Sequence, residues 1–445
     1  MKPSLETLFY QSEMPMVQVL SDMEHVGVRC DTDTAMRMEL KCSKLLAAYD
    51  DYWTTNVFKP YGVSWSSPKQ LLALFKSQGL PIQYKMRIAK DKSRKRTECI
   101  DEDVLELYRD GYKSKLAGLV LFMRKLKKAT DFTHIYSSDG RAHARYMDQR
   151  GGRIQAKEPD LQNIPEELEA AGVTVLPRTI IVPDDPGSDC IISADFDALE
   201  FYIYGYATQD AAILKAKKEG VYIYGIFYKD IFGGSFFEEG KPPKKWHRRK
   251  DIPPWELLVA KSGPLGMLYG RNVGSLQKGF GIPQARALAI YQGFHREHPG
   301  VGSHHTSLLY EANRQGYLKN FFGRIRRFPN PRMAQNEIMA FTGQSNGADI
   351  LRRCALLPLS SGLKDFGARL MLTVHDSVVV SCPRRALHGC VEYVRECMEQ
   401  PLPEMNNFWI PCTIKVSTKE TSTTGSANWG DAIEYETHVA QFGYR

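Results

Sequence analysis

Two stretches of apolar residues in the chain end at acidic residues. Ile191 and Ile192 begin an apolar run that leads to Asp195, which predicts a buried strand with this carboxylate at its end. Residues 370–374 and 378–381 form two further apolar runs. Their spacing predicts a β-hairpin with His375 and Asp376 near the turn.

The rest of the pattern divides into helical and strand-like regions. Helical periodicity dominates residues 16–130, with a start signal at residues 66–68 and a stop at Gly79. Strand-like segments alternate with turns over residues 131–207, a helical region covers residues 208–335, and strands return near residues 371–381 and 410–416. We therefore expect an α+β fold whose sheet is assembled from distant segments and interrupted by a helical subdomain.

The charge composition indicates which class of partner the chain would bind. The chain has 445 residues and a net charge of +8, which favours a polyanionic partner where the charge is clustered. Two basic runs provide such clusters: Lys85, Arg87, Lys90, Lys92, Arg94, Lys95 and Arg96, and then Lys241, Lys244, Lys245, Arg248, Arg249 and Lys250. A solvated loop face is the alternative for each run, whereas phosphate binding would make affinity steeply dependent on salt.

The cysteines and the apolar segments indicate the cellular environment of the protein. Nine cysteines without a CxxC or a zinc-type spacing indicate a reduced intracellular protein without disulfides. The first residues lack the pattern of a signal peptide, and the apolar run at residues 118–123 is too short to span a bilayer. We expect a soluble cytoplasmic protein without a membrane partner, with the adjacent His304 and His305 in a surface role.

The acidic strand ends favour a particular chemistry. Two carboxylates on adjacent strand ends can hold two Mg²⁺ ions about 4 Å apart, the arrangement that supports in-line phosphoryl displacement. A single aspartate at a strand end is more often a turn or cap residue. Between the two acids lies KSGPLGMLYG, in which Lys261 and Tyr269 are eight residues apart and therefore face the same side of a helix. The three signatures together indicate nucleotidyl transfer.

Ten motifs then match one known family in order. They are GRAH (140–143), GGR (151–153), PDLQNIP (159–165), DFDALE (195–200), AKSGPLGMLYG (260–270), HREHPGV (295–301), FGRIRRFP (322–329), GQSNGADI (343–350), VHDS (374–377) and NWG (428–430). The chain thereby resembles the polymerase module of family A DNA polymerases, the bacterial polymerase I type, over residues 16–429. The resemblance implies a right-hand fold with a mainly antiparallel palm sheet and helical fingers and thumb. The corresponding division is a lead (1–15), a thumb (16–130), a first palm segment (131–207), fingers (208–335) and a second palm segment (336–445).

The resemblance also implies an activity and its residues. The chain would add dNTPs to a primer 3′-hydroxyl on a DNA template, with Asp195 and Asp376 as the catalytic metal-binding pair and the Phe196 carbonyl as a further ligand. The cofactor would be two Mg²⁺ ions, which Mn²⁺ can replace. Lys261, also catalytic, would bind the triphosphate and help protonate pyrophosphate. Glu200 and Tyr269 would exclude a ribose 2′-hydroxyl, and Leu265 would line the same nucleotide site.

The implied DNA contacts come from several motifs. Arg153 and Gln344 correspond to side chains that probe minor-groove acceptors, and His375 corresponds to a primer-terminus histidine. Gln162 and Asn163 lie in a DNA-contacting loop, with a structural turn as the alternative. The first basic run adds Lys92, Arg94, Lys95 and Arg96.

Four positions depart from the family pattern. Leu257 stands where an arginine of the triphosphate clamp is expected, with Arg248, Arg249 or Lys250 as possible replacements, and Leu265 stands where an aromatic residue is expected. Pro264 predicts a kinked or broken helix. Ser377 replaces a glutamate beside Asp376, which leaves Asp197 as a possible extra acid or a surface residue.

The same resemblance leaves three further expectations. Motifs of a 3′–5′ exonuclease are absent, so we expect no intrinsic proofreading, a possible separate exonuclease partner, and a viral or phage source. A phage-type single-subunit RNA polymerase is the alternative within the same fold, and Glu200 and PDLQNIP argue against it. An inactive DNA-binding or scaffold protein is the alternative from another class, motivated by Leu257, Pro264 and Leu265.

Overall fold

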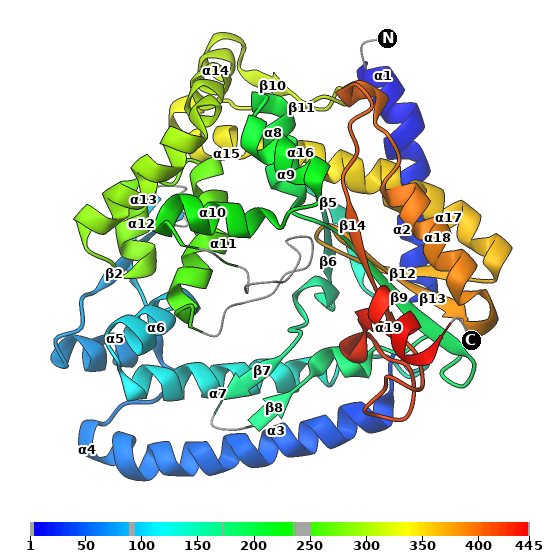
Figure 1. Ribbon diagram of the computed structural model, residues 1–445. Helices are drawn as coiled ribbons and strands as arrows, with labels where there is room; N and C mark the ends of the chain where they lie inside the picture. Colours follow the sequence, from blue (N-terminus) through cyan, green and yellow to red (C-terminus); the bar gives the residue numbers. More distant parts are fainter. Residues whose placement is uncertain (1–3, 89–93, 171–172, 235, 237–250, 444–445) are drawn as a thin grey trace.

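A five-stranded antiparallel sheet forms the centre of the molecule in the computed structural model, which describes residues 4–88, 94–170, 173–234, 236 and 251–443 (Figure 1). The strands lie in the order β12 (Arg369–Val374), β13 (Ser377–Pro383), β9 (Asp189–Phe196), β14 (Cys412–Ser417) and β15 (Ile433–Glu434). The predicted strand before Asp195 and the predicted hairpin at His375–Asp376 are therefore confirmed. Because these strands come from distant parts of the chain, the fold brings separate motifs to one sheet.

Alternate residues along the central strands are buried on opposite faces of the sheet. Ile192 and Ala194 on β9 pack into the main hydrophobic cluster, whereas Ile191 packs into the cluster on the opposite face. On β13, Val378 and Val380 join the first cluster and Val379 joins the second. Side chains point alternately to the two faces of a strand, so both faces of this sheet are buried.

Helices cover the sheet on the side of the main cluster. They include α2 (Met14–Val26), α17 (Leu357–Gly362) and α18 (Leu387–Met398), while α1 (Leu5–Leu8) precedes α2 and α19 (Tyr435–Phe442) follows β15. The apolar positions Met16, Val19 and Met23 bury one side of α2 against this cluster. The helical arm expected over residues 16–130 therefore begins after α2, because the apolar stripe of α2 packs on the sheet layer.

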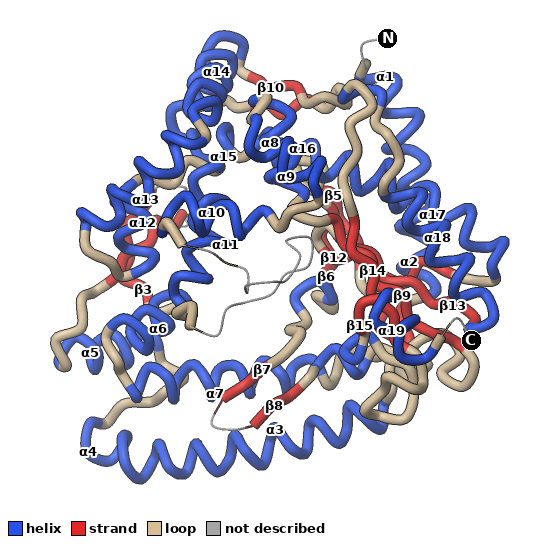
Figure 2. The backbone as a smooth tube through the Cα atoms, viewed as in Figure 1, coloured by secondary structure: helices blue, strands red, loops and turns tan. Residues whose placement is uncertain are grey.

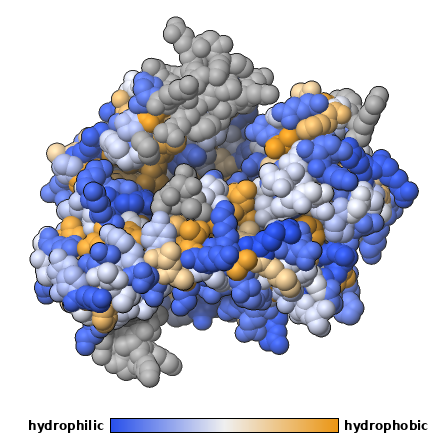
Figure 3. All heavy atoms as spheres, turned by 90° about the horizontal axis from the view of Figure 1, so that it is seen from below, coloured by the Kyte–Doolittle hydropathy of each residue, from blue (hydrophilic) through white to orange (hydrophobic). Residues whose placement is uncertain are grey.

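Two long helices form the arm itself, α3 (Thr32–Trp53) and α7 (Lys115–Phe132), which run side by side (Figure 1). The short elements at its far end are α4 (Lys59–Tyr61), α5 (Pro68–Ser77), α6 (Glu102–Glu106) and the hairpin of β2 (Gln83–Ile88) and β3 (Arg94–Cys99). The predicted start at residues 66–68 is confirmed, since the Ser67 hydroxyl accepts a hydrogen bond from Gln70 N–H at the beginning of α5. From below, this side of the molecule is mainly hydrophilic with separate apolar patches (Figure 3).

A second helical region follows β9 in the chain. It comprises α8 (Leu199–Thr208), α9 (Ala211–Glu219), α10 (Ile223–Phe232), α11 (Pro254–Leu268), α12 (Val273–Phe280), α13 (Gln284–Glu297), α14 (Pro299–Gln315), α15 (Gln335–Met339) and α16 (Phe341–Ile350). Residues 199–207, expected among strands and turns, form α8 instead, because most residues of this segment are apolar or aromatic and its inner side packs on α16.

Small two-stranded sheets connect these layers. They pair β1 (Val28–Arg29) with β4 (Arg141–Ala142), β5 (Arg145–Asp148) with β6 (Ile154–Lys157), β7 (Leu168–Ala170) with β8 (Val173–Val175), and β10 (Tyr317–Lys319) with β11 (Ile325–Arg327). The helical prediction for residues 208–335 missed β10 and β11. Figure 2 shows the strands of the central sheet gathered in one region with helices around them, and β3, β7, β8 and β10 apart from that sheet. No helix formed by the described residues combines the length and apolarity needed to cross a membrane.

Candidate active site

The two predicted carboxylates meet at one end of the central strands. On β9, Asp195 lies opposite Ser377 of β13, the residue that follows Asp376. The backbone N–H of Phe196 donates a hydrogen bond to the Asp376 carbonyl, with a distance of 3.4 Å between nitrogen and oxygen. The fold therefore places the segments of Asp195, Phe196 and Asp376 side by side.

Electrostatics distinguish this pair from ordinary surface acids. Although the Asp195 residue is accessible to solvent, surrounding protein atoms desolvate its carboxylate, and Asp376 and Asp197 add negative charge nearby. Burial, followed by this repulsion, raises the pKa of Asp195. Burial also raises the pKa of Asp376. Such a pair gains stability from a nearby cation.

A tight hairpin turn presents Asp376. Val374 pairs with Ser377, so His375 and Asp376 are the two turn residues, and His375 has a φ of 56°. This is the left-handed region, which is strained for a side chain other than glycine and recurs at functional sites. The Ser377 hydroxyl donates to the Val374 carbonyl at 2.8 Å. Serine, where a glutamate was expected, therefore closes the turn.

Asp197 is neither a surface residue nor fully solvated. Its carboxylate accepts a hydrogen bond from the Thr413 hydroxyl at 2.7 Å, and it is partly buried. Burial and the nearby acids Glu399 and Glu434 raise the pKa of Asp197 to about 6, although the Thr413 bond opposes the shift. The Asp197 carboxylate is thus bonded to β14, and its backbone N–H donates to the Pro411 carbonyl.

A cavity of about 290 Å³ brings five of the predicted residues together. Arg153, Glu200, Gln344, His375 and Asp376 all line it. They come from the β5–β6 turn, the start of α8, α16 and the β12–β13 turn. A second cavity, of about 610 Å³, is lined by Tyr269 and shares Gln344 with the first. These residues converge only through the tertiary fold.

Glu200 is the polar centre of the first cavity. Arg153 donates a hydrogen bond to its carboxylate at 2.5 Å, and the Glu200 side chain is 17% exposed. The Tyr269 hydroxyl is buried beside this carboxylate. Burial and the negative charge of Glu200 raise the pKa of Tyr269. Arg153 and Tyr269 thus both lie against the Glu200 carboxylate.

Two glycines let α8 and α16 approach closely enough to make this cavity. A Cβ on Gly343 would lie 3.1 Å from the Tyr204 ring and 3.4 Å from Glu200 Cβ, and a Cβ on Gly347 would lie 3.1 Å from Leu199. Gln344 lies between these glycines in sequence and is only partly buried. The GQSNG segment thus packs against α8 while Gln344 reaches both cavities.

The end of α11 holds Tyr269 in place. The Leu268 carbonyl accepts a hydrogen bond from the Tyr204 hydroxyl at 3.0 Å and contacts His305 Nε2 at 2.8 Å. The surface role expected for His304 and His305 is wrong, because His305 is buried and His304 bonds the Thr342 hydroxyl at 2.8 Å. These histidines belong to the packing behind the site.

The other α11 positions explain part of the departure from the family pattern. The helix continues through Pro264, so the expected break does not occur. Leu257 packs beside a small apolar cluster of Tyr228, Phe236, Ile252 and Ala260, and Leu265 packs against the main core. Lys261 is exposed on this helix. Both leucines are thus accommodated by neighbouring apolar groups.

Two predicted DNA contacts in the β6-to-β7 loop have different surroundings. Gln162 is buried, and its amide bonds Ala156 N–H at 3.0 Å and the Thr373 carbonyl at 3.2 Å. These internal bonds support the structural alternative for this side chain. Asn163 remains exposed and donates to Asp160 at 2.6 Å.

The structure describes the two basic runs only in part. Lys92 and the second run, Lys241 to Lys250, lie outside the described residues. Arg94, Lys95 and Arg96 belong to β3 by their backbone, and their side chains are outside the described atoms.

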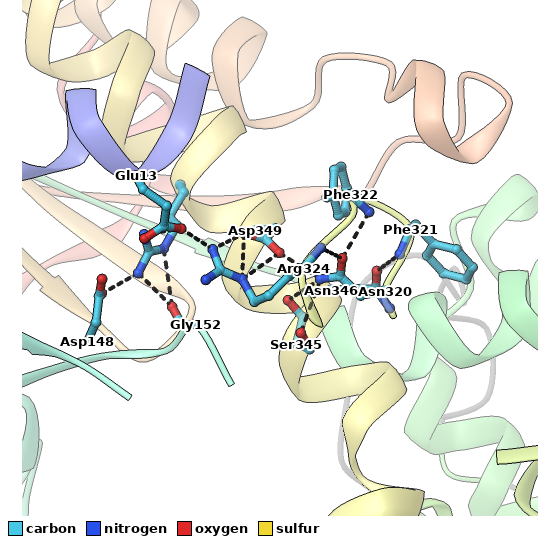
Figure 4. Close-up of polar contacts among 11 residues, drawn as sticks. Glu13, Asp148, Gly152, Asn320, Phe321, Phe322, Arg324, Ser345, Asn346 and Asp349 are labelled. Carbon is cyan, nitrogen blue, oxygen red and sulfur yellow. Dashed lines mark hydrogen bonds and ion pairs between the residues drawn. The ribbon is translucent and has the colours of Figure 1, made fainter. Parts of the chain in front are cut away.

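Sequence reasoning missed a cluster of charged residues around the buried Arg352 (Figure 4). Its members are Glu13, Asp148, Arg324, Asp349 and Arg352. Arg324 and Asp349 lie in the FGRIRRFP and GQSNGADI motifs, so those motifs were the available signal. Pattern alone could not show that they meet Glu13, which is more than 300 residues away in sequence.

Comparisons with known proteins agree with the fold. The sequence model described as DNA polymerase family A matches residues 41–430. DNA polymerase I of Streptococcus pneumoniae serotype 4 is 26% identical over 421 residues, covering 89% of this chain and 44% of the relative. DNA polymerase I of Bacillus subtilis is 26% identical over 416 residues, with the same two shares. The chain thus spans less than half the length of these relatives.

A solved structure gives the same result for the fold. The POL domain of Pol1 from M. smegmatis, in complex with DNA primer-template and dNTP, matches with a TM-score of 0.76 at 20% identity, covering 96% of this chain and 71% of that one. The α+β right-hand polymerase fold expected from the sequence is confirmed. With the family match over most of its length, the chain belongs to DNA polymerase family A.

Proposed function

We propose that this chain is a DNA-directed DNA polymerase that extends a primer 3′-hydroxyl with dNTPs on a DNA template. The observation that carries the proposal is the cavity in which Arg153, Glu200, Gln344, His375 and Asp376 converge from distant segments. Membership of the family supports the activity, as does the M. smegmatis neighbour, which was solved in complex with DNA primer-template and dNTP.

Asp195 and Asp376 would hold two Mg²⁺ ions. Asp195 and Asp376 lie on adjacent strand ends, and because the pKa of each carboxyl is raised, a bound cation would relieve an electrostatic cost. Mg²⁺ prefers oxygen donors and is commonly held by one or two carboxylates together with substrate phosphates. When bound, the two ions would activate the primer hydroxyl and neutralise the triphosphate, with Mn²⁺ able to replace them. The Phe196 carbonyl is proposed as a further ligand.

The remaining residues orient the nucleotide. Glu200 and Tyr269 would lie against the sugar of the incoming dNTP, where a ribose 2′-hydroxyl would meet a desolvated, already bonded carboxylate. Leu265 would contact the same nucleotide. Lys261, exposed on α11, would bind the triphosphate and protonate the pyrophosphate leaving group.

The DNA partner would be held by several elements. Arg153, Gln344 and His375 would contact the primer terminus and template base pair, and Asn163 and the β2–β3 region would contact the backbone. We assign the central sheet and its covering helices to the palm, the α3–α7 arm to the thumb, and α9–α14 to the fingers. A separate exonuclease partner, the absence of proofreading and a viral source stay predictions.

The alternatives make different predictions. A phage-type RNA polymerase is not favoured, because the matching family and its polymerase I relatives are DNA polymerases. An inactive scaffold would bind primer-template without extending it.

A primer-extension assay with Mg²⁺ and either dNTPs or NTPs tests the proposal. We expect extension with dNTPs only. The extension rate of Asp376→Asn should be about 100-fold lower, because one carboxylate of the pair is neutralised. Asp365→Asn, at an exposed acid outside the cavity, is the control and should retain wild-type rates. Primer binding without extension by the wild-type protein would instead favour the scaffold, and extension with NTPs would favour the RNA polymerase.

A further inference from the structure

A buried arginine pair lies directly behind the turn that carries Arg153. Arg352 is fully buried in the π-helical segment Leu351–Leu356 that continues α16. Its Nε and one terminal nitrogen both donate to the Gly152 carbonyl, at 3.2 and 2.9 Å. The same guanidinium donates to Asp148, at the end of β5. Arg352 therefore holds the β5–β6 turn at two points, immediately before Arg153.

Arg324 closes the other side of this turn. A Cβ on Gly152 would lie 2.6 Å from Arg324 Nε, and the φ of Gly152 is 88°, so only glycine suits the position. Arg324 itself is fixed by Asp349, with its Nε 2.9 Å and a terminal nitrogen 2.6 Å from carboxylate oxygens. Asn320 supports Asp349 with a third hydrogen bond of 2.6 Å. The turn is thus enclosed by two guanidinium groups that are themselves held by hydrogen bonds.

Glu13 joins the two arginines. It lies in the π-helical segment Phe9–Glu13 between α1 and α2, and its two carboxylate oxygens are 3.1 and 3.2 Å from Arg352. One of these oxygens also accepts from Arg324 (Figure 4). Two arginines thus face three carboxylates, those of Glu13, Asp148 and Asp349. A fully buried charge such as that of Arg352 is retained when it is paired and hydrogen-bonded.

We propose that Arg352, with Arg324 and Glu13, is a positioning residue for the primer terminus, acting through the Gly152–Arg153 turn. The bonds to Gly152 and Asp148 fix the backbone from which Arg153 reaches Glu200. The N-terminal segment is part of this support through Glu13. The inference rests on the proposed role of Arg153 and adds the residues that hold Arg153 in place.

A double-mutant cycle of Arg153→Ala and Arg352→Met tests the proposal by single-turnover extension of a matched primer. If Arg352 acts through Arg153, each single variant lowers the extension rate about tenfold, and the double variant is no slower than either. Multiplicative losses, with the double about 100-fold slower, would overturn the proposal. Arg352→Lys, which retains the charge and can bond Gly152, should recover part of the rate.

Two controls separate positioning from general destabilisation. Leu356→Ala removes a fully buried side chain from the same helical segment and should lower the melting temperature without slowing extension at about 25 °C. Arg353→Met removes the adjacent arginine, which pairs with Glu404 on another face, and should behave like wild type. A loss in Leu356→Ala equal to that in Arg352→Met would mean that Arg352 is only structural.

Hydrogen exchange provides a readout that does not depend on activity. Across the turn, the Gly152 N–H donates to the Gln149 carbonyl and the Gln149 N–H donates to the Arg153 carbonyl, each at 2.8 Å. Arg352→Met should speed the exchange of both N–H groups at least about tenfold, whereas Leu356→Ala should not. Unchanged exchange would overturn the proposal even if extension is slow. Conversely, full activity of Arg153→Ala together with faster exchange in Arg352→Met would overturn the role of Arg153 and leave its support by Arg352 established.

Discussion

Several residues at the candidate site are explained by their contacts within the protein, without any contact with DNA. Ser377 closes the β12–β13 turn, Leu257 fills an apolar cluster, and the Gln162 amide satisfies backbone groups of β6 and β12. Arg153 and Glu200 differ, because their bond faces a cavity. A polar side chain whose bonding capacity is used inside the protein has little left for a ligand.

Gln162 allows the two kinds of role to be separated. We expect Gln162→Leu to lower the free energy of unfolding by about 1–3 kcal/mol, because buried backbone groups lose their partners. The folded protein should bind primer-template with unchanged affinity, measured by fluorescence anisotropy below the melting transition. Asn163→Ala, at the exposed neighbouring position, should change stability by less than about 0.5 kcal/mol. Weaker DNA binding by Gln162→Leu at unchanged stability would restore the DNA-contact interpretation.

Contacts between elements extend from the site to the tip of the arm. The helix α12 ends at Gly281, whose φ of 62° suits glycine, and a Cβ there would lie 2.5 Å from Leu107 of the π-helical segment Leu107–Gly111. The cavity lined by Tyr269 is bounded on this side by Tyr84 and Leu107 of the arm. The arm and the α9–α14 helices are thus in contact beside the proposed nucleotide site.

Alanine at Gly281 should disturb this contact. Gly62 has nearly the same backbone conformation, with a φ of 64° and no atom within 4 Å of a Cβ, so Gly62→Ala is a matched control. Both variants should lose about 1 kcal/mol from the left-handed backbone. Only Gly281→Ala should speed hydrogen exchange of residues 107–111, and adding Leu107→Ala should reverse much of that increase. Equal exchange in the two alanine variants would show that the contact does not hold the arm tip.

At the scale of the whole molecule, buried charge links helices that are distant in sequence. His298, fully buried between α13 and α14, has Nδ1 2.8 Å from an Asp210 oxygen and Nε2 3.6 Å from an Asp230 oxygen. Asp210 also caps α9 by accepting from Ile213 N–H at 3.0 Å, and Asp230 belongs to α10. Burial alone would lower the pKa of His298, but the two carboxylates outweigh it and raise the pKa to about 9.

This histidine predicts how stability depends on pH. Because its folded-state pKa exceeds the unfolded value of about 6.5, the added stability is complete below that pH and is lost as pH rises through about 9. The contribution is about 3 kcal/mol at most. Urea unfolding between about pH 6 and pH 10 should show this decline in wild type and a smaller one in His298→Gln. An identical decline in both proteins would assign it to other groups.

The sequence by itself determined the local elements and the motifs. Alternation around Asp195 and the apolar runs flanking His375 and Asp376 specify strands and a tight turn, because side-chain periodicity is a local property. Ordered motifs likewise identified the family and its fold. The helix α8 was missed because its side chains are apolar nearly all round, which gives no helical period.

Only the tertiary structure decided which residues meet. It joined Glu13 to Arg324 and Arg352, placed His298 between two aspartates, and buried Gln162. These outcomes depend on contacts between residues far apart in sequence, where burial and pairing set the energy of a charge or an amide and local pattern carries no information about either. The carboxylates were visible in the sequence, and the support that orients Arg153 toward Glu200 was not.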